Sequence, residues 1–133
     1  MRAAEAPPPG RFAWVDAAPV KTSIYLGTVA LTATRFLREG DVYVAQYGAK
    51  VFPYFFMSEA GRLRIEVSDS DLRRLAGGTG IVFQGVAVRA DGRVRAVDGK
   101  ATPVDATSGR LKVRIHVNRH LTLVFDSTYR LPQ

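Results

Sequence analysis

Cysteine is absent from the 133-residue sequence, and histidine occurs only as His116 and His120. Without cysteine there is no disulfide framework, no Cys-ligated zinc site, no iron–sulfur cluster and no thiol nucleophile. The sequence also lacks a zinc-protease motif, a nucleophile elbow and a phosphate loop. We therefore predict no metal site and no cofactor, and we favour a non-catalytic protein over an enzyme with an unrecognised active site on its loops.

Long apolar runs are missing as well. The longest, Val51–Met57, is interrupted by Pro53, whereas a membrane-spanning helix needs about 20 apolar residues. The sequence thus predicts no transmembrane segment. The Pro-rich residues 1–10 lack the apolar stretch of a signal peptide and are expected to be a disordered tail. We favour an exported protein, periplasmic or secreted, over a cytoplasmic one, because small and Pro-rich residues often follow a cleavage site.

Lysine is scarce, since only four of the 19 basic residues are Lys and the others are Arg. With 12 acidic residues the formal net charge is +7, and residues 67–133 carry most of it. Two interpretations stay open. The arginine excess reflects the codon bias of a GC-rich genome, which we rank first, or the basic half binds an anionic partner such as a glycan, a nucleic acid, a membrane surface or an acidic protein.

Apolar and polar residues alternate along much of the chain, as is typical of half-buried antiparallel strands. We expect strands near residues 12–16, 22–36, 41–52, 54–58, 62–67, 80–89, 93–98, 110–117 and 121–128. Eight or nine short strands predict an all-β fold, either an antiparallel β-sandwich or a small β-barrel, formed by residues 11–133 as a single domain. One short helix is expected at 70–76, with Ser70 as its N-cap and Gly77 at its end.

Glycine-closed turns at 38–40, 59–61 and 90–92 match three-residue hairpin loops. Pairing apolar residues across the third turn places Val88 opposite Val94, with both valines on the buried face.

The same reasoning pairs Phe55 with Ile65 across the second turn. It pairs Ile115 with Leu123 across a final loop at 118–120.

In the register of the third turn, Arg89 lies opposite Arg93, and Arg95 shares their outward face. Like charges placed opposite each other are destabilising unless an anion neutralises them. The three arginines therefore form a candidate anion-binding site. The competing interpretation, which we rank first, is a solvated surface.

The apolar run suggests a second candidate site. A strand at 54–58 would place Phe52, Tyr54 and Phe56 on one face, with Phe56 opposite Arg64. Either another element of the fold covers this face, which we rank first, or the four residues form an interaction surface, for which we favour a homo-oligomer.

The histidines and the Asp69–Asp71 pair indicate no site. His116 is expected to point outward from its strand and His120 to lie in a loop, so nothing makes their rings converge. Negative charge at a helix N-terminus explains Asp69 and Asp71 without a bound calcium ion.

Residues 85–104 end in Gly99-Lys100-Ala101-Thr102-Pro103-Val104. This segment resembles the closing segment of YceI-type lipid-binding barrels over about twenty residues, although the chain is shorter and adds a hairpin after it. The resemblance implies a small barrel that holds an apolar or lipid ligand in the cell envelope. We keep this as the alternative to a non-catalytic module for an anionic partner or self-association.

Overall fold

The computed structural model describes residues 12–24 and 27–132, and the predicted tail at 1–10 lies outside this range. Ten strands, one 3₁₀ turn and one α-helix follow each other along the chain. They are β1 (Trp14–Ala17), β2 (Val20–Ile24), β3 (Gly27–Ala33), β4 (Phe36–Glu39), β5 (Val42–Phe52), η1 (Phe55–Met57), β6 (Glu59–Glu66), α2 (Asp69–Ala76), β7 (Ile81–Arg89), β8 (Val94–Pro103), β9 (Ser108–Asn118) and β10 (Leu121–Arg130).

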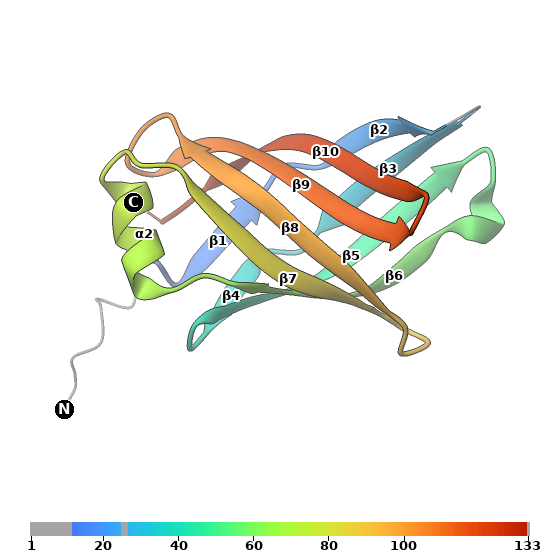
Figure 1. The fold of residues 1–133 in the computed structure, drawn as a ribbon, viewed down its shortest axis with the longest axis horizontal. Helices are drawn as coiled ribbons and strands as arrows, with labels where there is room; N and C mark the ends of the chain where they lie inside the picture. Colours follow the sequence, from blue (N-terminus) through green and yellow to red (C-terminus); the bar gives the residue numbers. More distant parts are fainter. Residues whose placement is uncertain (1–11, 25–26, 133) are drawn as a thin grey trace.

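The strands form a closed antiparallel barrel. Strands β4 to β10 pair in succession, and β1 joins β10 to β4, which closes a ring of eight. The two further strands extend the sheet beside β4, because β3 pairs with the second half of β5 and β2 pairs with β3. Figure 1 shows the barrel from the side. The expected all-β fold is confirmed, and the structure decides for the barrel.

Two strand predictions are wrong. The stretch predicted as a strand at 22–36 spans the end of β2, all of β3 and the first residue of β4. Residues 55–57 form the 3₁₀ turn η1, and residues 59–61 belong to β6, where Gly61 lies opposite Tyr47. The reversal of the chain therefore occurs before Glu59, around Pro53, which cannot donate a ladder hydrogen bond. The predicted pairing of Phe55 with Ile65 is therefore wrong as well, and Ile65 lies opposite Tyr43.

The predicted registers of the β7–β8 and β9–β10 hairpins are confirmed. In the β7–β8 hairpin, however, the face that is buried is not the one predicted. Val88 lies opposite Val94, and Gly92 closes the turn with φ of +90°. Ala87 is 1% exposed while Val94 is 61% exposed, so the neighbours of the predicted residues face the interior.

In the last hairpin Ile115 pairs with Leu123 as expected. The ladder shifts between Leu121 and Thr122, so that Leu121 pairs with Asn118 and the loop shortens to 119–120.

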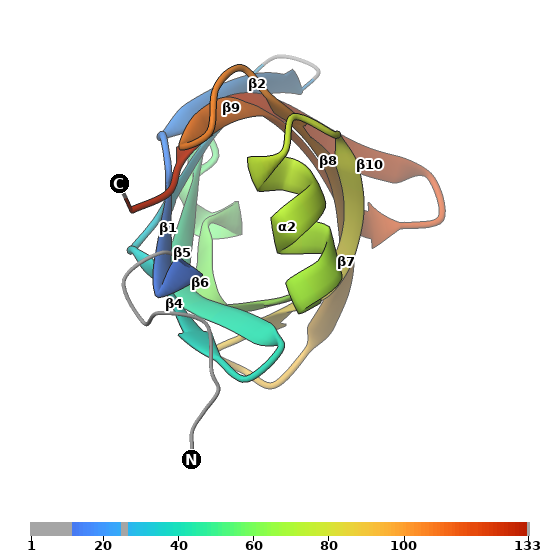
Figure 2. The ribbon, with the colours of Figure 1, turned by 90° about the vertical axis from the view of Figure 1, so that its left-hand side faces the viewer.

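Helix α2 lies across one end of the barrel, as the end-on view in Figure 2 shows. Its apolar side is buried through Leu72 and Leu75, which are 2% and 5% exposed. The N-cap is Ser68, whose hydroxyl accepts a hydrogen bond from the backbone N–H of Asp71, and not Ser70 as predicted. Arg38 ties the helix to the β4–β5 turn through an ion pair with Asp69. We call this end of the barrel the helix end.

The interior holds two apolar clusters that meet inside the ring. The first lies under α2 and is made by Phe12, Tyr43, Val67, Leu72, Leu75, Ile81, Ala101, Tyr129 and Leu131. The second lies farther from the helix and is made by Val29, Tyr47, Val51, Leu63, Ala87, Val97, Ile115 and Phe125. No charged side chain is fully buried in the described part of the chain, so the barrel interior is an apolar environment.

Candidate binding site

A cavity of about 120 Å³ lies inside the barrel toward the helix end. Its walls come from most strands of the ring and from α2, and nearly all of the lining side chains are apolar. An apolar cavity of this size is too unfavourable for ordered water, and an engineered cavity of about 150 Å³ in another protein stays dry and binds benzene. The space is thus suited to an apolar molecule the size of one aromatic ring.

Small residues occur on the inward faces of β8 and β9. Gly99 and Ala101 point inward from β8, and Gly109 points inward from β9. A Cβ on Gly99 would lie 2.4 Å from the ring of Phe83, its partner on β7, so the ring lies over the glycine. Because glycine has no side chain, the neighbouring aromatic ring can lie against the barrel wall at each of these positions.

Tyr129 is the most unusual residue of the cavity wall. It is 3% exposed, and its hydroxyl is a buried polar atom without a hydrogen-bond partner, the only one of its kind in the described side chains. Its ring lies over Gly109, whose built Cβ would stand 2.6 Å from the hydroxyl oxygen. Burial, with a smaller contribution from the charge of Asp105, raises the pKa of Tyr129 to about 12. The phenol is neutral at physiological pH and can both donate and accept a hydrogen bond.

The other tyrosines of the interior are satisfied. Tyr43 donates to the backbone carbonyl of Phe12 at 2.7 Å, and Tyr47 donates to the Glu59 carboxylate at 2.7 Å. Buried polar groups are nearly always paired, because an unpaired one costs desolvation energy with no compensating bond. The unpaired hydroxyl of Tyr129 therefore distinguishes the cavity from the rest of the interior.

A charged network closes the interior opposite the helix. Arg95 reaches inward from β8 and donates to Glu59 at 2.8 Å, and it also donates to the backbone carbonyl of Val117 at 3.1 Å. Arg89 approaches the same carboxylate at 3.8 Å. The side chains of Glu59 and Arg95 are only 14% and 17% exposed. We call this the tip end of the barrel.

The network favours the charged forms of Glu59 and Arg95 and the neutral form of Tyr47. Burial raises the pKa of the Glu59 carboxyl, but hydrogen bonds from Arg95 and Tyr47 and the charge of Arg89 together outweigh burial, so the pKa lies below its ordinary value. Burial and then the hydrogen bond to Glu59 raise the pKa of Tyr47 above its usual range. The hydrogen bond to Glu59 likewise raises the pKa of Arg95.

This network corrects the prediction of an outward arginine face. Arg89 and Arg95 turn inward and pair with Glu59. Arg93 alone is largely exposed, at 78%, and lies 3.9 Å from Asp91. The reasoning assumed three unpartnered charges, and this assumption is wrong. Anion binding by Arg89, Arg93 and Arg95 stays a prediction without that support.

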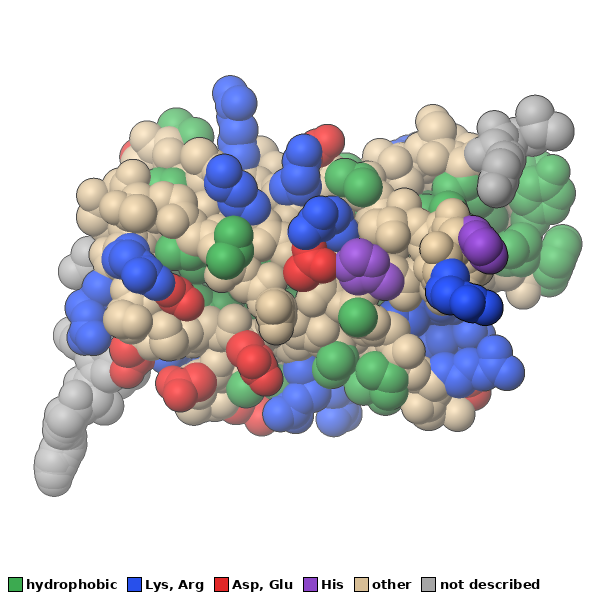
Figure 3. Space-filling view, viewed as in Figure 1, with side chains coloured by type: hydrophobic (Ala, Val, Ile, Leu, Met, Phe, Trp, Pro, Cys, Tyr) green, Lys and Arg blue, Asp and Glu red, His purple; other side chains and the backbone are tan. Residues whose placement is uncertain are grey.

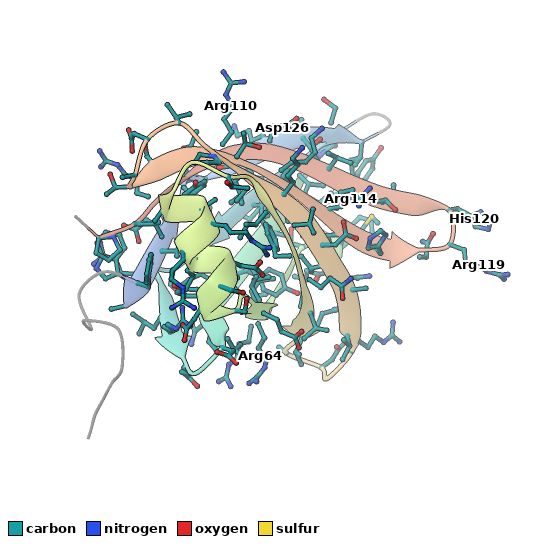
Figure 4. All side chains as sticks on the ribbon, turned by 60° about the vertical axis from the view of Figure 1, so that its left-hand side comes forward. Arg64, Arg110, Arg114, Arg119, His120 and Asp126 are labelled. Atoms are coloured by element: carbon teal, nitrogen blue, oxygen red, sulfur yellow. The ribbon has the colours of Figure 1, made fainter. Side chains whose placement is uncertain are left out.

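The aromatic residues of the second predicted site are exposed, but they do not form a strand face with Arg64. Phe52, Tyr54 and Phe56 are 59%, 37% and 85% exposed; Phe52 ends β5, and the other two lie in the β5–β6 connection. Arg64 lies midway along β6, opposite Val44 and Val86, and points away from the barrel wall (Figure 4). The contact between Phe56 and Arg64 is thus wrong, and the role of the four residues as an interaction surface stays a prediction.

His116 points outward as predicted, while His120 lies at the tip of the β9–β10 loop (Figure 4). The His116 ring bridges Thr122 at 3.2 Å and Asp98 at 2.6 Å, and Arg114 also binds Asp98. The hydrogen bond from His116 is the main cause of the lowered pKa of Asp98. This series of hydrogen bonds lies on the outer wall of the barrel, away from the cavity. Neither histidine therefore contacts the interior.

Residues 12–24 and 27–132 contain no group of three or more His, Cys, Asp or Glu side chains arranged to hold a metal ion. Within the same ranges no helix is long and apolar enough to span a membrane. Comparison with known proteins found no matching family model, no matching curated protein and no matching solved structure. The resemblance of residues 85–104 to YceI-type barrels gains no support from these comparisons. The fold defines the protein as a small closed antiparallel β-barrel with an apolar interior cavity.

Proposed function

We propose that the protein binds a small apolar molecule of about the size of a single aromatic ring, with one hydrogen-bonding group, inside the barrel. The observation that carries this proposal is the cavity of about 120 Å³ with its almost entirely apolar wall. Ligand sites are typically concave and apolar with a few polar groups that orient the ligand. This proposal develops the alternative of a small barrel with an apolar ligand. The anionic-partner alternative has less support, because Arg89 and Arg95 pair with Glu59.

The hydroxyl of Tyr129 supports a polar group on the ligand. A ligand hydroxyl or carbonyl that bonded to Tyr129 would satisfy this atom, and the desolvation energy of the phenol would then favour the bound state. Phenol and toluene differ only in such a group and serve as probes. Phenol is expected to bind about fivefold to tenfold more tightly than toluene, which corresponds to about 1 kcal/mol.

A pair of substitutions on β8 tests whether binding occurs in the cavity. Ala101 lines the cavity and is 5% exposed, whereas Ala96 on the same strand is exposed on the outer wall. Ala101→Leu should fill the cavity and weaken phenol binding at least tenfold in isothermal titration calorimetry. Ala96→Leu should leave the affinity within twofold. Equal affinities for the two variants, or no saturable binding of either probe to the unmodified protein, would refute the proposal.

A further inference from the structure

The end of β5 and the β5–β6 connection expose an unbroken apolar segment that we call the aromatic tip, residues 52–57. Phe55, Phe56 and Met57 are 61%, 85% and 57% exposed. The segment contains no charged residue. Soluble proteins rarely leave several large apolar side chains together in water, so such a cluster marks a contact surface.

The tip is held in shape by its own hydrogen bonds. The N–H of Met57 donates to the carbonyl of Tyr54 at 2.9 Å, and the N–H of Val51 donates to the Ser58 hydroxyl at 2.9 Å. The rings of Phe52 and Phe55 meet edge to face with centroids 5.7 Å apart. The tip therefore presents its apolar side chains without an ordering step on contact.

The tip end of the barrel is basic. In its loops and strand ends, residues 50–62, 89–95 and 118–121, six Lys and Arg residues face only two carboxylates. Both carboxylates, Glu59 and Asp91, already pair with arginines of that end. Lys50, Arg62 and Arg119 have no ion pair among the described side chains, and Figure 4 shows Arg119 projecting from its loop.

The helix end has the opposite charge balance. Its loops, residues 38–42, 66–80, 102–108 and 130–132, hold six carboxylates and four arginines. In the face shown in Figure 3, acidic side chains gather low on the helix side, while basic and apolar side chains lie together at the other end. A molecule polarised in this way is oriented by a negative surface so that its basic end approaches first.

We propose that the aromatic tip docks the barrel on an anionic lipid bilayer, with the phenyl rings in the interfacial layer and the surrounding Lys and Arg side chains on lipid phosphates. Aromatic side chains favour the membrane interface, and nearby basic residues add attraction to anionic headgroups. A second copy of the chain fits less well, because two basic ends would face each other. Six tip residues are also few beside the 20–30 that each partner contributes to a stable protein interface.

Co-sedimentation with vesicles tests the proposal. Vesicles of phosphatidylcholine with 30% phosphatidylglycerol should bind the protein at least tenfold more tightly than pure phosphatidylcholine, and 0.5 M salt should weaken this binding. The double variant Phe55→Ser/Phe56→Ser should bind at least tenfold more weakly. Its matched control is Val82→Ser/Val104→Ser, which removes apolar residues that are 74% and 70% exposed elsewhere, and it should remain within twofold of the unmodified protein.

A second pair of variants tests the charges. Arg93→Glu/Arg119→Glu should lose most of the binding to anionic vesicles, whereas Lys100→Glu/Arg110→Glu, on the outer wall away from the tip, should lose little. An equal loss in both pairs would show that only net charge matters. The proposal also fails if the unmodified protein does not sediment with anionic vesicles, or if it is a dimer that Phe55→Ser/Phe56→Ser converts to a monomer. Ala101→Leu should bind vesicles normally, which separates this test from that of the cavity.

Discussion

Replacing Tyr129 by phenylalanine should stabilise the ligand-free protein, although most core substitutions destabilise. The Tyr129 hydroxyl is buried with no partner, and such a group costs about 1–3 kcal/mol relative to its hydrated state. Its removal leaves a small void, which offsets about 0.3 kcal/mol of the gain at ~24 cal/mol per Å³. The free energy of unfolding should therefore rise by about 1–2 kcal/mol.

Urea denaturation at neutral pH measures this change. With an m-value of about 2 kcal/mol per molar urea, the middle of the range for small proteins, the midpoint should rise by roughly 0.5–1 M with an unchanged m-value. Tyr43→Phe and Tyr47→Phe are the controls, because each loses a hydrogen bond of 2.7 Å. Each control should lower the free energy of unfolding by about 1 kcal/mol.

Tyr129→Phe should also weaken phenol binding about fivefold to tenfold and leave toluene binding within twofold, because only phenol uses the hydroxyl. A loss of stability in Tyr129→Phe as large as in Tyr43→Phe would refute the reasoning, since it would mean that the hydroxyl has a partner in solution.

Four further outcomes follow from the same structure. Glu59→Gln leaves the half-buried Arg95 without its counterion and should lower the free energy of unfolding by about 2–3 kcal/mol in urea denaturation. The control Asp126→Asn loses an exposed ion pair with Lys112 at 4.0 Å and should change the free energy of unfolding by less than about 0.5 kcal/mol. Because the pKa of Glu59 is lowered in the folded state, its contribution to stability is complete above its ordinary pKa and is lost as pH falls through the folded value. The free energy of unfolding should therefore decline below about pH 4.5, and this decline should be smaller in Glu59→Gln. Leu72→Ala truncates a side chain of α2 that is 2% exposed. It should lower the free energy of unfolding, measured by thermal unfolding, by about 3 kcal/mol and admit ligands larger than toluene. In native-state hydrogen exchange, the amides of β2 should exchange faster than those of β8, whose two edges are both paired; equal protection would contradict this.

Local patterns were sufficient for most of the strands and for two of the hairpin registers, because period-two alternation and glycine-closed turns are short-range signals. The inward face of β7 and β8 could not be chosen by counting apolar residues. Val88 and Val94 are more apolar than Gly99 and Ala101, which share the inward face of the two strands with large residues such as Phe83 and Val97. Neither apolarity nor size alone therefore marked the inward face.

The candidate site depended on contacts between distant parts of the sequence. Glu59 meets Tyr47 and Arg95, which are 12 and 36 residues away, so no local pattern indicates this network. Tyr129 lies one residue beyond the strand predicted at 121–128, and no sequence pattern singled it out. Its unpaired hydroxyl follows from its position over Gly109 across the β9–β10 ladder. Pro53 was the available local signal against a strand at 54–58.

A weakly joined part of the barrel wall connects the two proposals. Helix α2 lies over one end of the barrel and the Glu59 network lies at the other, and the cavity reaches the side of the barrel at Val20 and Leu31. Among the described residues, β2 has no ladder with β10, and the chain there is joined by the Ala18–Thr128 backbone bond of 3.0 Å and the Ser127–Ala18 bond of 2.7 Å.

Parting this seam breaks two hydrogen bonds worth about 1 kcal/mol each. The ladders of β1 with β10 and with β4 are similarly short, whereas those between neighbours from β5 to β10 are much longer. Val20 and Ser127, on the two sides of the seam, both line the cavity. From Val20 the seam runs along β2 toward the tip end, where Thr28 pairs with Phe52. A barrel docked through its aromatic tip would therefore hold this weakly joined seam next to the bilayer, where apolar molecules are concentrated.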